Sequence, residues 1–186
     1  MFDWFANNFD LPILQWIRDC LSCDFLDAVM PPITHLADAG MIWILTALVL
    51  MCLRKYRKLG LAAGVALIIG LIICNLILKP LVHRPRPYDY MWEYYGTEVK
   101  LLIEAQHDFS FPSGHTIASF EVATVLMLNN RRLGIPALVL ACIIAFSRLY
   151  LYVHYPTDVL TAILFGIGFG VLGNFWVQKG YEKMRS

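Results

Sequence analysis

Residues 59–78 read LGLAAGVALIIGLIICNLIL, and Asn75 is the only polar side chain among these twenty residues. A transmembrane helix needs about 20 consecutive apolar residues, which this stretch supplies. The whole chain has the same character, since 59% of its 186 residues are hydrophobic and 16% are charged. Soluble domains are about 45–50% apolar and about 25% charged. The sequence therefore predicts an integral membrane protein of one domain, residues 1–186.

Four further apolar runs accompany this stretch, each long enough, or nearly so, to cross a bilayer. We expect an all-α fold, a polytopic membrane bundle of about five transmembrane helices within residues 37–178. The five predicted spans are centred on residues 40–53, 59–78, 116–128, 133–147 and 158–177.

The N-terminal residues 1–36 differ from these spans, because aromatic and aliphatic side chains alternate there with acids. Acidic side chains are costly at the centre of a bilayer. We therefore expect an amphipathic helix in the membrane interface, broken by Pro31 and Pro32 before the first span. A sixth, irregular span is the alternative. The stretch has no basic region and no small-residue cleavage site, so we expect no removable signal peptide.

The short basic loops predict the orientation of the bundle. RKYRK (54–58), NNRR (129–132) and KGYEKMRS (179–186) fall on one side of a five-span topology, which the positive-inside rule makes cytoplasmic. The opposite side receives the long loop 80–112 and the segment 148–157. The formal net charge is only +1, so we expect no nucleic-acid partner.

The cysteines and glycines favour structural interpretations. Cys20 and Cys23 form a lone CxxC without a second pair, which is weak evidence for a zinc or redox site. Small residues four positions apart let transmembrane helices approach closely. This spacing predicts packing contacts at Gly60 with Gly64 and at Gly166 with Gly170.

Three polar clusters interrupt the apolar sequence, and each alone has an ordinary structural explanation. KPLVHRPRP (79–87) follows the second span, with Lys79 expected to end the helix; it could be a basic belt at a helix end. FPSGHT (111–116) opens the third span and could be a plain helix start. SRLYLYVHYPTD (147–158) joins the last two spans and could hold a surface ion pair.

The three clusters fall on the same side of the predicted membrane, and together they favour a phosphate site. Arginine forks match phosphate oxygens, and the free amides of a helix start bind anions. If the last corner is helical, Asp158 lies beside His154 and fixes its tautomer. Two histidines can divide the work of a nucleophile and a general acid. No cluster has the carboxylates that magnesium requires, so we expect neither metal nor cofactor.

On these residues the chain resembles the type 2 phosphatidic acid phosphatase superfamily, whose pattern is K-x6-R-P, P-S-G-H and S-R-x5-H-x3-D. Every position of the pattern is present between residues 79 and 158. The resemblance implies a metal-free phosphatase in which His154 attacks phosphorus, Asp158 holds its ring, and His115 protonates the leaving oxygen. The implied phosphate ligands are Lys79, Arg86, Ser113, Gly114 and Arg148.

Two basic residues and one acid lie outside the pattern. Arg84 and His83 are candidates to contact a second phosphate or a headgroup. Glu121 lies inside the third span, where we expect a polar contact between helices rather than a catalytic acid.

The resemblance implies a lipid phosphate or diphosphate substrate, with surrounding membrane lipids as the other partners. Size and sidedness favour undecaprenyl pyrophosphate, hydrolysed at the extracytoplasmic face of a bacterial inner membrane. Phosphatidic acid, phosphatidylglycerophosphate and lipid A are the alternative substrates. A vanadium haloperoxidase, and a lipid-binding or transport protein on the same scaffold, are the alternative classes. The sequence does not predict an oligomeric state.

Overall fold

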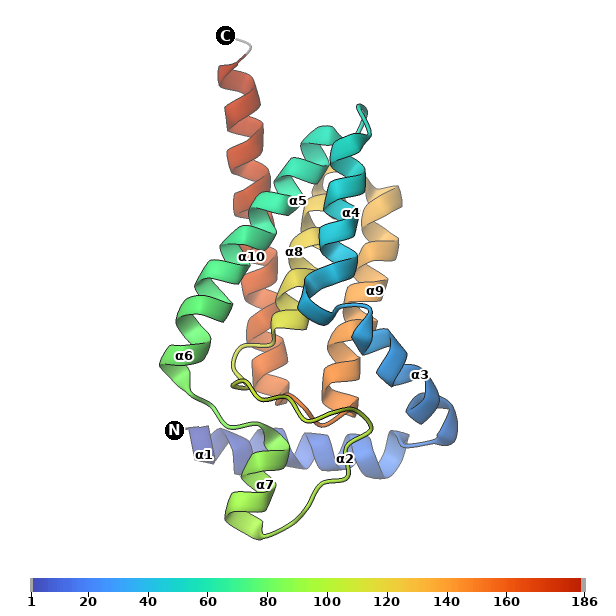
Figure 1. Cartoon of the computed structure of the whole chain (residues 1–186), viewed down its shortest axis with the longest axis vertical. Helices are drawn as coiled ribbons and strands as arrows, with labels where there is room; N and C mark the ends of the chain where they lie inside the picture. Colours follow the sequence, from blue (N-terminus) through green and yellow to red (C-terminus); the bar gives the residue numbers. More distant parts are fainter. Residues whose placement is uncertain (1, 185–186) are drawn as a thin grey trace.

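The computed structural model describes residues 2–184, which form helices and loops without a β-strand (Figure 1). Arg185 and Ser186 of the predicted basic tail lie outside the described residues. The elements are α1 (Phe2–Phe5), π-helical η1 (Ala6–Asp10), α2 (Leu11–Leu21), α3 (Asp24–His35), the 3-10 turn η2 (Asp38–Gly40), α4 (Met41–Cys52), α5 (Arg57–Gly70), π-helical η3 (Leu71–Leu78), α6 (Lys79–Val82), α7 (Pro87–Tyr95), α8 (Gly114–Asn129), α9 (Arg131–Tyr150) and α10 (Pro156–Lys183).

Helix α8 is the central helix of the bundle and packs against α4, α5, α9 and α10. Nine of its sixteen residues are buried, and these include the polar Thr116, Ser119 and Glu121. The outer helices instead expose large apolar side chains, as a surface in contact with lipid does. These side chains include Leu45, Leu48, Ile68, Leu76, Leu160, Leu164 and Phe175.

The prediction of an all-α membrane bundle is confirmed. Helices occupy all five predicted spans, but they differ in length. Among residues 2–184, three helical stretches are long and apolar enough to cross a membrane: Arg57–Tyr95, Arg131–Tyr150 and Pro156–Lys183. Helices α3 and α4 make a fourth if the pair, bent by 46°, counts as one span. Helix α8, with 16 residues, is shorter than a typical span.

Two predicted helix ends are wrong. Pro31 and Pro32 lie inside α3, because the proline ring holds φ near the helical value. The chain breaks later, where Ala39 and Gly40 have φ of 51° and 73°. The second span likewise does not end at Lys79, since Pro80 stands in the first turn of α6, where a helix tolerates a missing N–H.

The N-terminal segment lies across one end of the bundle, where α2 passes beneath α8 and α9 (Figure 1). Its helix is amphipathic, with Leu14 and Ile17 buried against the protein and Trp16 exposed. The helix is amphipathic as predicted, and its place in the membrane interface stays a prediction. Asp10 is the exception among the acids, because its side chain is fully buried in the protein.

Two of the four predicted glycine contacts join α10 to α8. A Cβ on Gly166 would come within 2.7 Å of Phe120 Cβ, and one on Gly170 within 2.7 Å of the Glu121 carbonyl oxygen. Gly60 meets α4 in the same way, at 2.4 Å from the Met51 backbone nitrogen. The prediction for Gly64 is wrong, because no atom lies within 4 Å of the site of its Cβ.

We expect Gly170→Ala to lower the free energy of unfolding by about 1–3 kcal/mol, because the added methyl group overpacks the contact with α8. Gly168→Ala is the matched control on the same helix, since a Cβ there meets no atom within 4 Å. Thermal unfolding of both variants in detergent measures the difference. Equal midpoints for the two variants would contradict the close packing of α8 and α10.

Candidate active site

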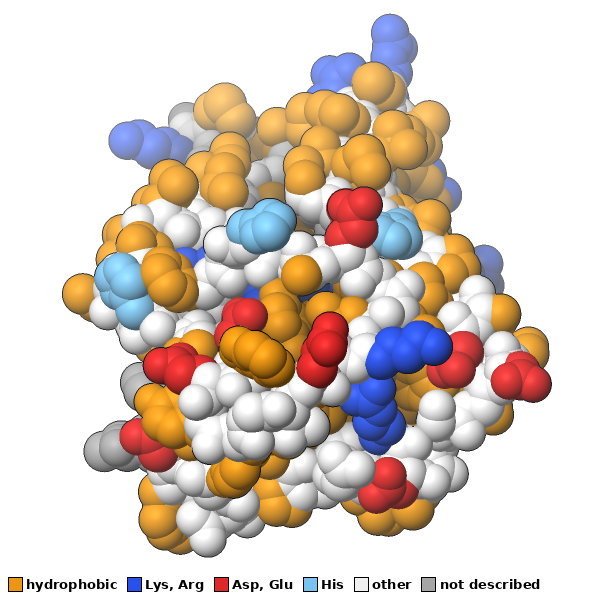
Figure 2. All heavy atoms as spheres, turned by 60° about the horizontal axis from the view of Figure 1, so that its bottom comes forward, with side chains coloured by type: hydrophobic (Ala, Val, Ile, Leu, Met, Phe, Trp, Pro, Cys, Tyr) orange, Lys and Arg blue, Asp and Glu red, His pale blue; other side chains and the backbone are white. Residues whose placement is uncertain are grey.

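The three polar clusters meet at the end of the bundle that α2 covers. Figure 2 looks toward this end and shows histidine, acidic and basic side chains gathered among apolar ones. A cavity of about 810 Å³ opens here and extends between α4 and α5. Six of the eight residues predicted to be catalytic or to bind phosphate line it: Lys79, Arg86, Gly114, His115, Arg148 and His154.

The corner of residues 151–155 places His154 in this cavity. The corner is not helical, although a helical corner was the condition under which we predicted the pairing of His154 with Asp158. Instead, the backbone N–H groups of Val153 and His154 both donate to the Arg148 carbonyl oxygen, at 3.2 and 3.3 Å. Tyr152 has φ of 61°, a conformation that L-residues rarely adopt outside tight turns. The turn therefore wraps His154 around the end of α9.

Asp158 lies beside His154 despite the turn, because it stands in the first turn of α10 and reaches back over the corner. Its Oδ2 accepts hydrogen bonds from the Tyr155 N–H at 3.1 Å and the Ser110 hydroxyl at 2.5 Å. The same oxygen lies 3.6 Å from His154 Nδ1. Asp158 is fully buried and does not line the cavity, so it lies behind the ring as seen from the cavity.

The other ring nitrogen of His154 faces the cations. Nε2 lies 3.4 Å from Arg86 Nη1, and only 1% of the His154 residue surface is exposed. Burial, followed by the charges of Arg86 and Arg148, lowers the pKa of His154 well below its ordinary value. The imidazole is therefore neutral near pH 7, and a proton on Nδ1, toward Asp158, would leave the lone pair of Nε2 facing Arg86.

Lys79 and Arg86 converge on Asp108, a residue of the long loop that the sequence analysis missed. Both side chains form ion pairs with its carboxylate, and Arg86 Nε also donates to its carbonyl oxygen at 2.9 Å. Burial would raise the pKa of Asp108, but the hydrogen bonds and charges of Lys79 and Arg86 outweigh it and hold the pKa below its usual range. An anion therefore already occupies the space between two predicted phosphate ligands.

Arg148 and His115 line the cavity from α9 and α8. Arg148 Nη1 donates to Thr34 Oγ1 at 2.6 Å, while its buried Nε has no hydrogen-bond partner among residues 2–184. His115 Nε2 lies 2.9 Å from Asp38 Oδ1, a second carboxylate that the sequence analysis missed. An unpaired donor beside a histidine can receive an anion.

Gly114 and Ser113, at the start of α8, differ in position, because only Gly114 lines the cavity. Gly114 opens α8 close to Asn75, whose Oδ1 would lie 3.3 Å from a Cβ at position 114. Ser113 is fully buried and shares a 2.9 Å hydrogen bond with Thr116 Oγ1 within its own turn. Its hydroxyl does not line the cavity, so an anion contact from this side chain would need a different rotamer.

Arg84 and His83 do not lie where a second phosphate contact requires them. Arg84 is 3% exposed and points behind the corner, where it binds Asp158. The ring of His83 packs on Phe109 with centroids 4.4 Å apart, and neither basic residue lines the cavity. The sequence interpretation failed because an arginine in a basic cluster does not reveal that its partners are buried carboxylates.

The remaining wall of the cavity is apolar and descends between α4 and α5. Glu121 lines its inner part and packs against Gly70 of α5, but its buried Oε1 has no hydrogen-bond partner among residues 2–184, so the polar contact between helices stays a prediction. The apolar lining residues include Ile44, Leu48, Met51, Leu61, Val65, Ile68 and Leu71. Among residues 2–184, no three His, Cys, Asp or Glu side chains are placed to hold a metal ion.

Known proteins resemble this chain in sequence and in fold. The model of the PAP2 superfamily matches residues 59–182, which include all three clusters. The undecaprenyl-diphosphatase BcrC of Bacillus subtilis is 33% identical over 147 residues, covering 79% of this chain and 72% of that protein. Phosphatidylglycerophosphatase B of the same organism is 32% identical over 171 residues, or 86% and 76% of the two chains.

A solved structure agrees with these sequence relatives. The crystal structure of Aquifex aeolicus LpxE superposes with a TM-score of 0.69 at 27% identity, covering 88% of this chain and 93% of that one. With its apolar helices and its shared motifs, the chain belongs to the PAP2 superfamily and is a membrane phosphatase.

Proposed function

We propose that the protein hydrolyses the phosphate or diphosphate of a membrane lipid through a phosphohistidine on His154. One observation carries this proposal: the cavity joins a cationic end, where His154 Nε2 faces Arg86, to an apolar wall between α4 and α5. A phosphate at the cationic end would leave the lipid tail beside the apolar wall. Lipid tails bind such surfaces through burial of apolar area.

In the first step, His154 Nε2 attacks phosphorus, and the bond from phosphorus to the lipid oxygen breaks. The proton on Nδ1 faces Asp158, whose carboxylate offsets the positive charge that develops on the ring. His115, next to Asp38, takes up a proton from solvent when the anionic substrate binds, and it gives this proton to the departing oxygen. The lipid leaves with one phosphate fewer, and the enzyme holds the phosphoryl group on nitrogen.

In the second step, water attacks the phosphohistidine, and His115 takes its proton. The phosphorus–nitrogen bond breaks, which returns neutral His154 and releases phosphate. Lys79, Arg86 and Arg148 stabilise the charge on the phosphoryl oxygens in both steps. The unpaired Nε of Arg148 is a donor that a phosphoryl oxygen would satisfy.

We infer that the substrate is undecaprenyl pyrophosphate. The relatives support this choice, because undecaprenyl-diphosphatases occur among them. The relatives also include phosphatidylglycerophosphatase B and a lipid A 4'-phosphatase of Bacteroides thetaiotaomicron. Phosphatidylglycerophosphate and lipid A therefore stay in the panel of alternatives.

We also propose that the site faces away from the cytoplasm of a bacterial inner membrane. The basic residues of the α4–α5 and α8–α9 connections lie at the end of the bundle opposite the cavity mouth (Figure 1). At the cavity end, Lys79, Arg86 and Arg148 line the cavity and Arg84 is bound to buried acids. The positive-inside rule then assigns the opposite end to the cytoplasm.

We expect His154→Ala to abolish phosphate release from lipid, with a loss of several orders of magnitude, because no other group replaces the nucleophile. Purified protein in detergent is assayed with undecaprenyl pyrophosphate, phosphatidic acid and phosphatidylglycerophosphate. The wild-type protein retains its activity in EDTA and forms an acid-labile phosphoenzyme, which His154→Ala does not form.

Two results would contradict this scheme. Residual activity of His154→Ala near the wild-type level would exclude the phosphohistidine, and loss of wild-type activity in EDTA would exclude the metal-free mechanism. A higher kcat/KM for phosphatidic acid than for undecaprenyl pyrophosphate would change the substrate and leave the mechanism intact.

We expect Asp108→Asn to lower KM and the inhibition constant of orthovanadate by about 3- to 10-fold. A substrate must displace the Asp108 carboxylate from Lys79 and Arg86, and a site that is only partly open binds with reduced apparent affinity. Glu104→Gln is the control, because it removes an exposed charge from the same loop. An increase of KM in Asp108→Asn would mean that Asp108 aligns the two cations for the substrate.

We expect Thr97→Cys, in a background without the five native cysteines, to react with a membrane-impermeant maleimide added to intact cells. Residue 97 is exposed in the loop between α7 and α8. Lys55→Cys, in the α4–α5 connection, is expected to react only after the cells are permeabilised. The reverse pattern, in variants that retain phosphatase activity, would place the site on the cytoplasmic side.

A further inference from the structure

A buried acid of the N-terminal segment touches the support of the active site. Asp10 ends η1 and is fully buried. In the sequence it lies well before residues 59–182, which match the superfamily. Its Oδ2 accepts a hydrogen bond from Arg84 Nη2 at 2.7 Å and another from the Thr157 hydroxyl at 2.8 Å. Its Oδ1 accepts from the Thr157 N–H at 2.9 Å. Asp10 therefore caps the start of α10 from outside the helix.

Arg84 connects this acid to the catalytic carboxylate. Its Nη1 donates to Asp158 Oδ1 and, at 2.8 Å, to the Thr157 hydroxyl, while Nη2 is bound to Asp10. The guanidinium carbon lies 3.8 Å from the centroid of the Tyr155 ring, which stacks the planar group in place. One buried arginine thus bridges two buried carboxylates.

Packing alone does not require this bridge. Removing ions from water costs free energy, and apolar side chains of similar volume stabilise a protein as well or better. We therefore look for a role of the Asp10–Arg84–Asp158 series in the catalytic group that it contacts. That group is Asp158, whose second oxygen lies 3.6 Å from His154 Nδ1.

The two carboxylate oxygens of Asp158 have separate partners. Asp10 can affect Asp158 only through the oxygen that binds Arg84. Oδ1 is bound to Arg84, while Oδ2 receives Ser110 and the Tyr155 N–H and faces His154. If Arg84 were paired with Asp158 alone, its full charge would draw electron density from the carboxylate and weaken its hold on the imidazole. Asp10 shares that charge and fixes the guanidinium.

We propose that Asp10 is a positioning residue for phosphoryl transfer, which acts through Arg84 on Asp158 and makes the N-terminal segment part of the catalytic unit. This inference rests on the proposed role of His154 as nucleophile. In this proposal Arg84 holds Asp158 in position and does not contact a second phosphate.

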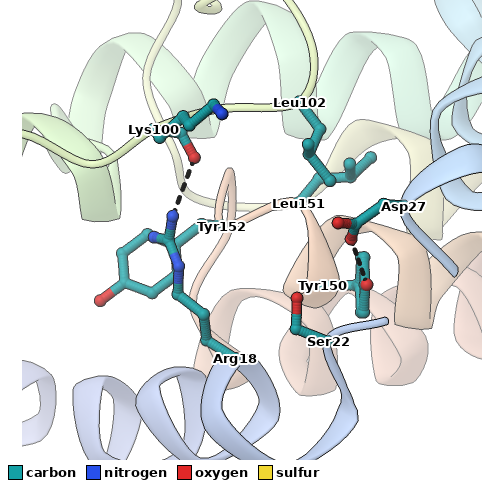
Figure 3. Close-up of a pocket in the computed structure, with 8 residues that line it drawn as sticks. All are labelled: Arg18, Ser22, Asp27, Lys100, Leu102, Tyr150, Leu151 and Tyr152. Atoms are coloured by element: carbon teal, nitrogen blue, oxygen red, sulfur yellow. Dashed lines mark hydrogen bonds between the residues drawn. The ribbon is translucent and has the colours of Figure 1, made fainter. Parts of the chain in front are cut away.

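Contacts independent of Asp10 also dock the N-terminal segment onto the same corner (Figure 3). Arg18 Nη2 donates to the Lys100 carbonyl oxygen at 3.0 Å, and the Tyr150 hydroxyl donates to Asp27 Oδ1 at 2.5 Å. These contacts hold α2 and α3 against the loop and the end of α9. Replacement of Asp10 therefore changes the charge at Arg84 and leaves the segment docked.

The test compares Asp10→Asn with Arg18→Gln in the full-length protein. Asp10→Asn keeps the size of the side chain and removes its charge, so we expect kcat to fall about 10- to 100-fold while KM changes less than about twofold. Arg18→Gln removes one exposed contact of the same segment, which the Tyr150–Asp27 contact continues to hold in place, so we expect its kcat to match the wild-type value. Thermal unfolding in detergent checks that both variants are folded.

A double-variant cycle shows whether Asp10 acts through Asp158. In the Asp158→Asn background, which retains a low rate, we expect Asp10→Asn to cause no further loss. If Asp10→Asn does not fold, Thr157→Val replaces it in the cycle, since it removes a hydroxyl that contacts both Asp10 and Arg84.

Three outcomes would overturn the inference. The first is an unchanged kcat in Asp10→Asn, and the second is an equal loss of kcat in Asp10→Asn and Arg18→Gln. The third is that Asp10→Asn lowers kcat by the same factor in the wild-type and the Asp158→Asn backgrounds. The His154→Ala assay separates these outcomes from a failure of the proposed function. If that variant retains activity, the phosphohistidine is excluded, whereas a dead His154→Ala with an unaffected Asp10→Asn excludes only the role of Asp10.

Discussion

The carboxylate of Asp158 is the group on which the geometry of the site depends. It closes the first turn of α10 by accepting the Tyr155 N–H, and it receives Ser110 from the long loop and Arg84 from the segment before α7. Three parts of the chain therefore meet at one buried negative charge. Since such a charge is stable only when it is paired, the same contacts that bury Asp158 also fix it beside His154.

The bilayer explains why so much polar chemistry gathers at one end. Hydrocarbon cannot satisfy backbone or charged groups, so the helices are apolar along their length and the functional groups lie where they end. Helices α8 and α10 both begin at this end and direct their first N–H groups toward it, where Asp10 accepts the Thr157 N–H of α10. The loops there must satisfy their own polar groups, and Arg86 does so by binding the carbonyl oxygens of Asp108 and Val153.

Sequence reasoning succeeded where the signal was local or repeated at a fixed spacing. It predicted the helical spans, the cavity-lining positions of Lys79, Arg86, His115, Arg148 and His154, and the pairing of His154 with Asp158. It missed Asp10, Asp38, Asp108 and Ser110, because each meets its partner across a long stretch of chain. Arg84 was misassigned for the same reason: Asp10 and Asp158 each lie 74 positions away from it.

The sequence by itself determined that this chain is a helical membrane protein with a phosphatase motif, since hydropathy and motif spacing are properties of consecutive residues. Only the tertiary structure decided which charged side chains line the cavity and which pair with one another. The reason is physical: an arginine in an extended segment can face water, lipid phosphate or a buried acid with equal local cost. The environment of Arg84 exists only after η1, the long loop and α10 have packed together.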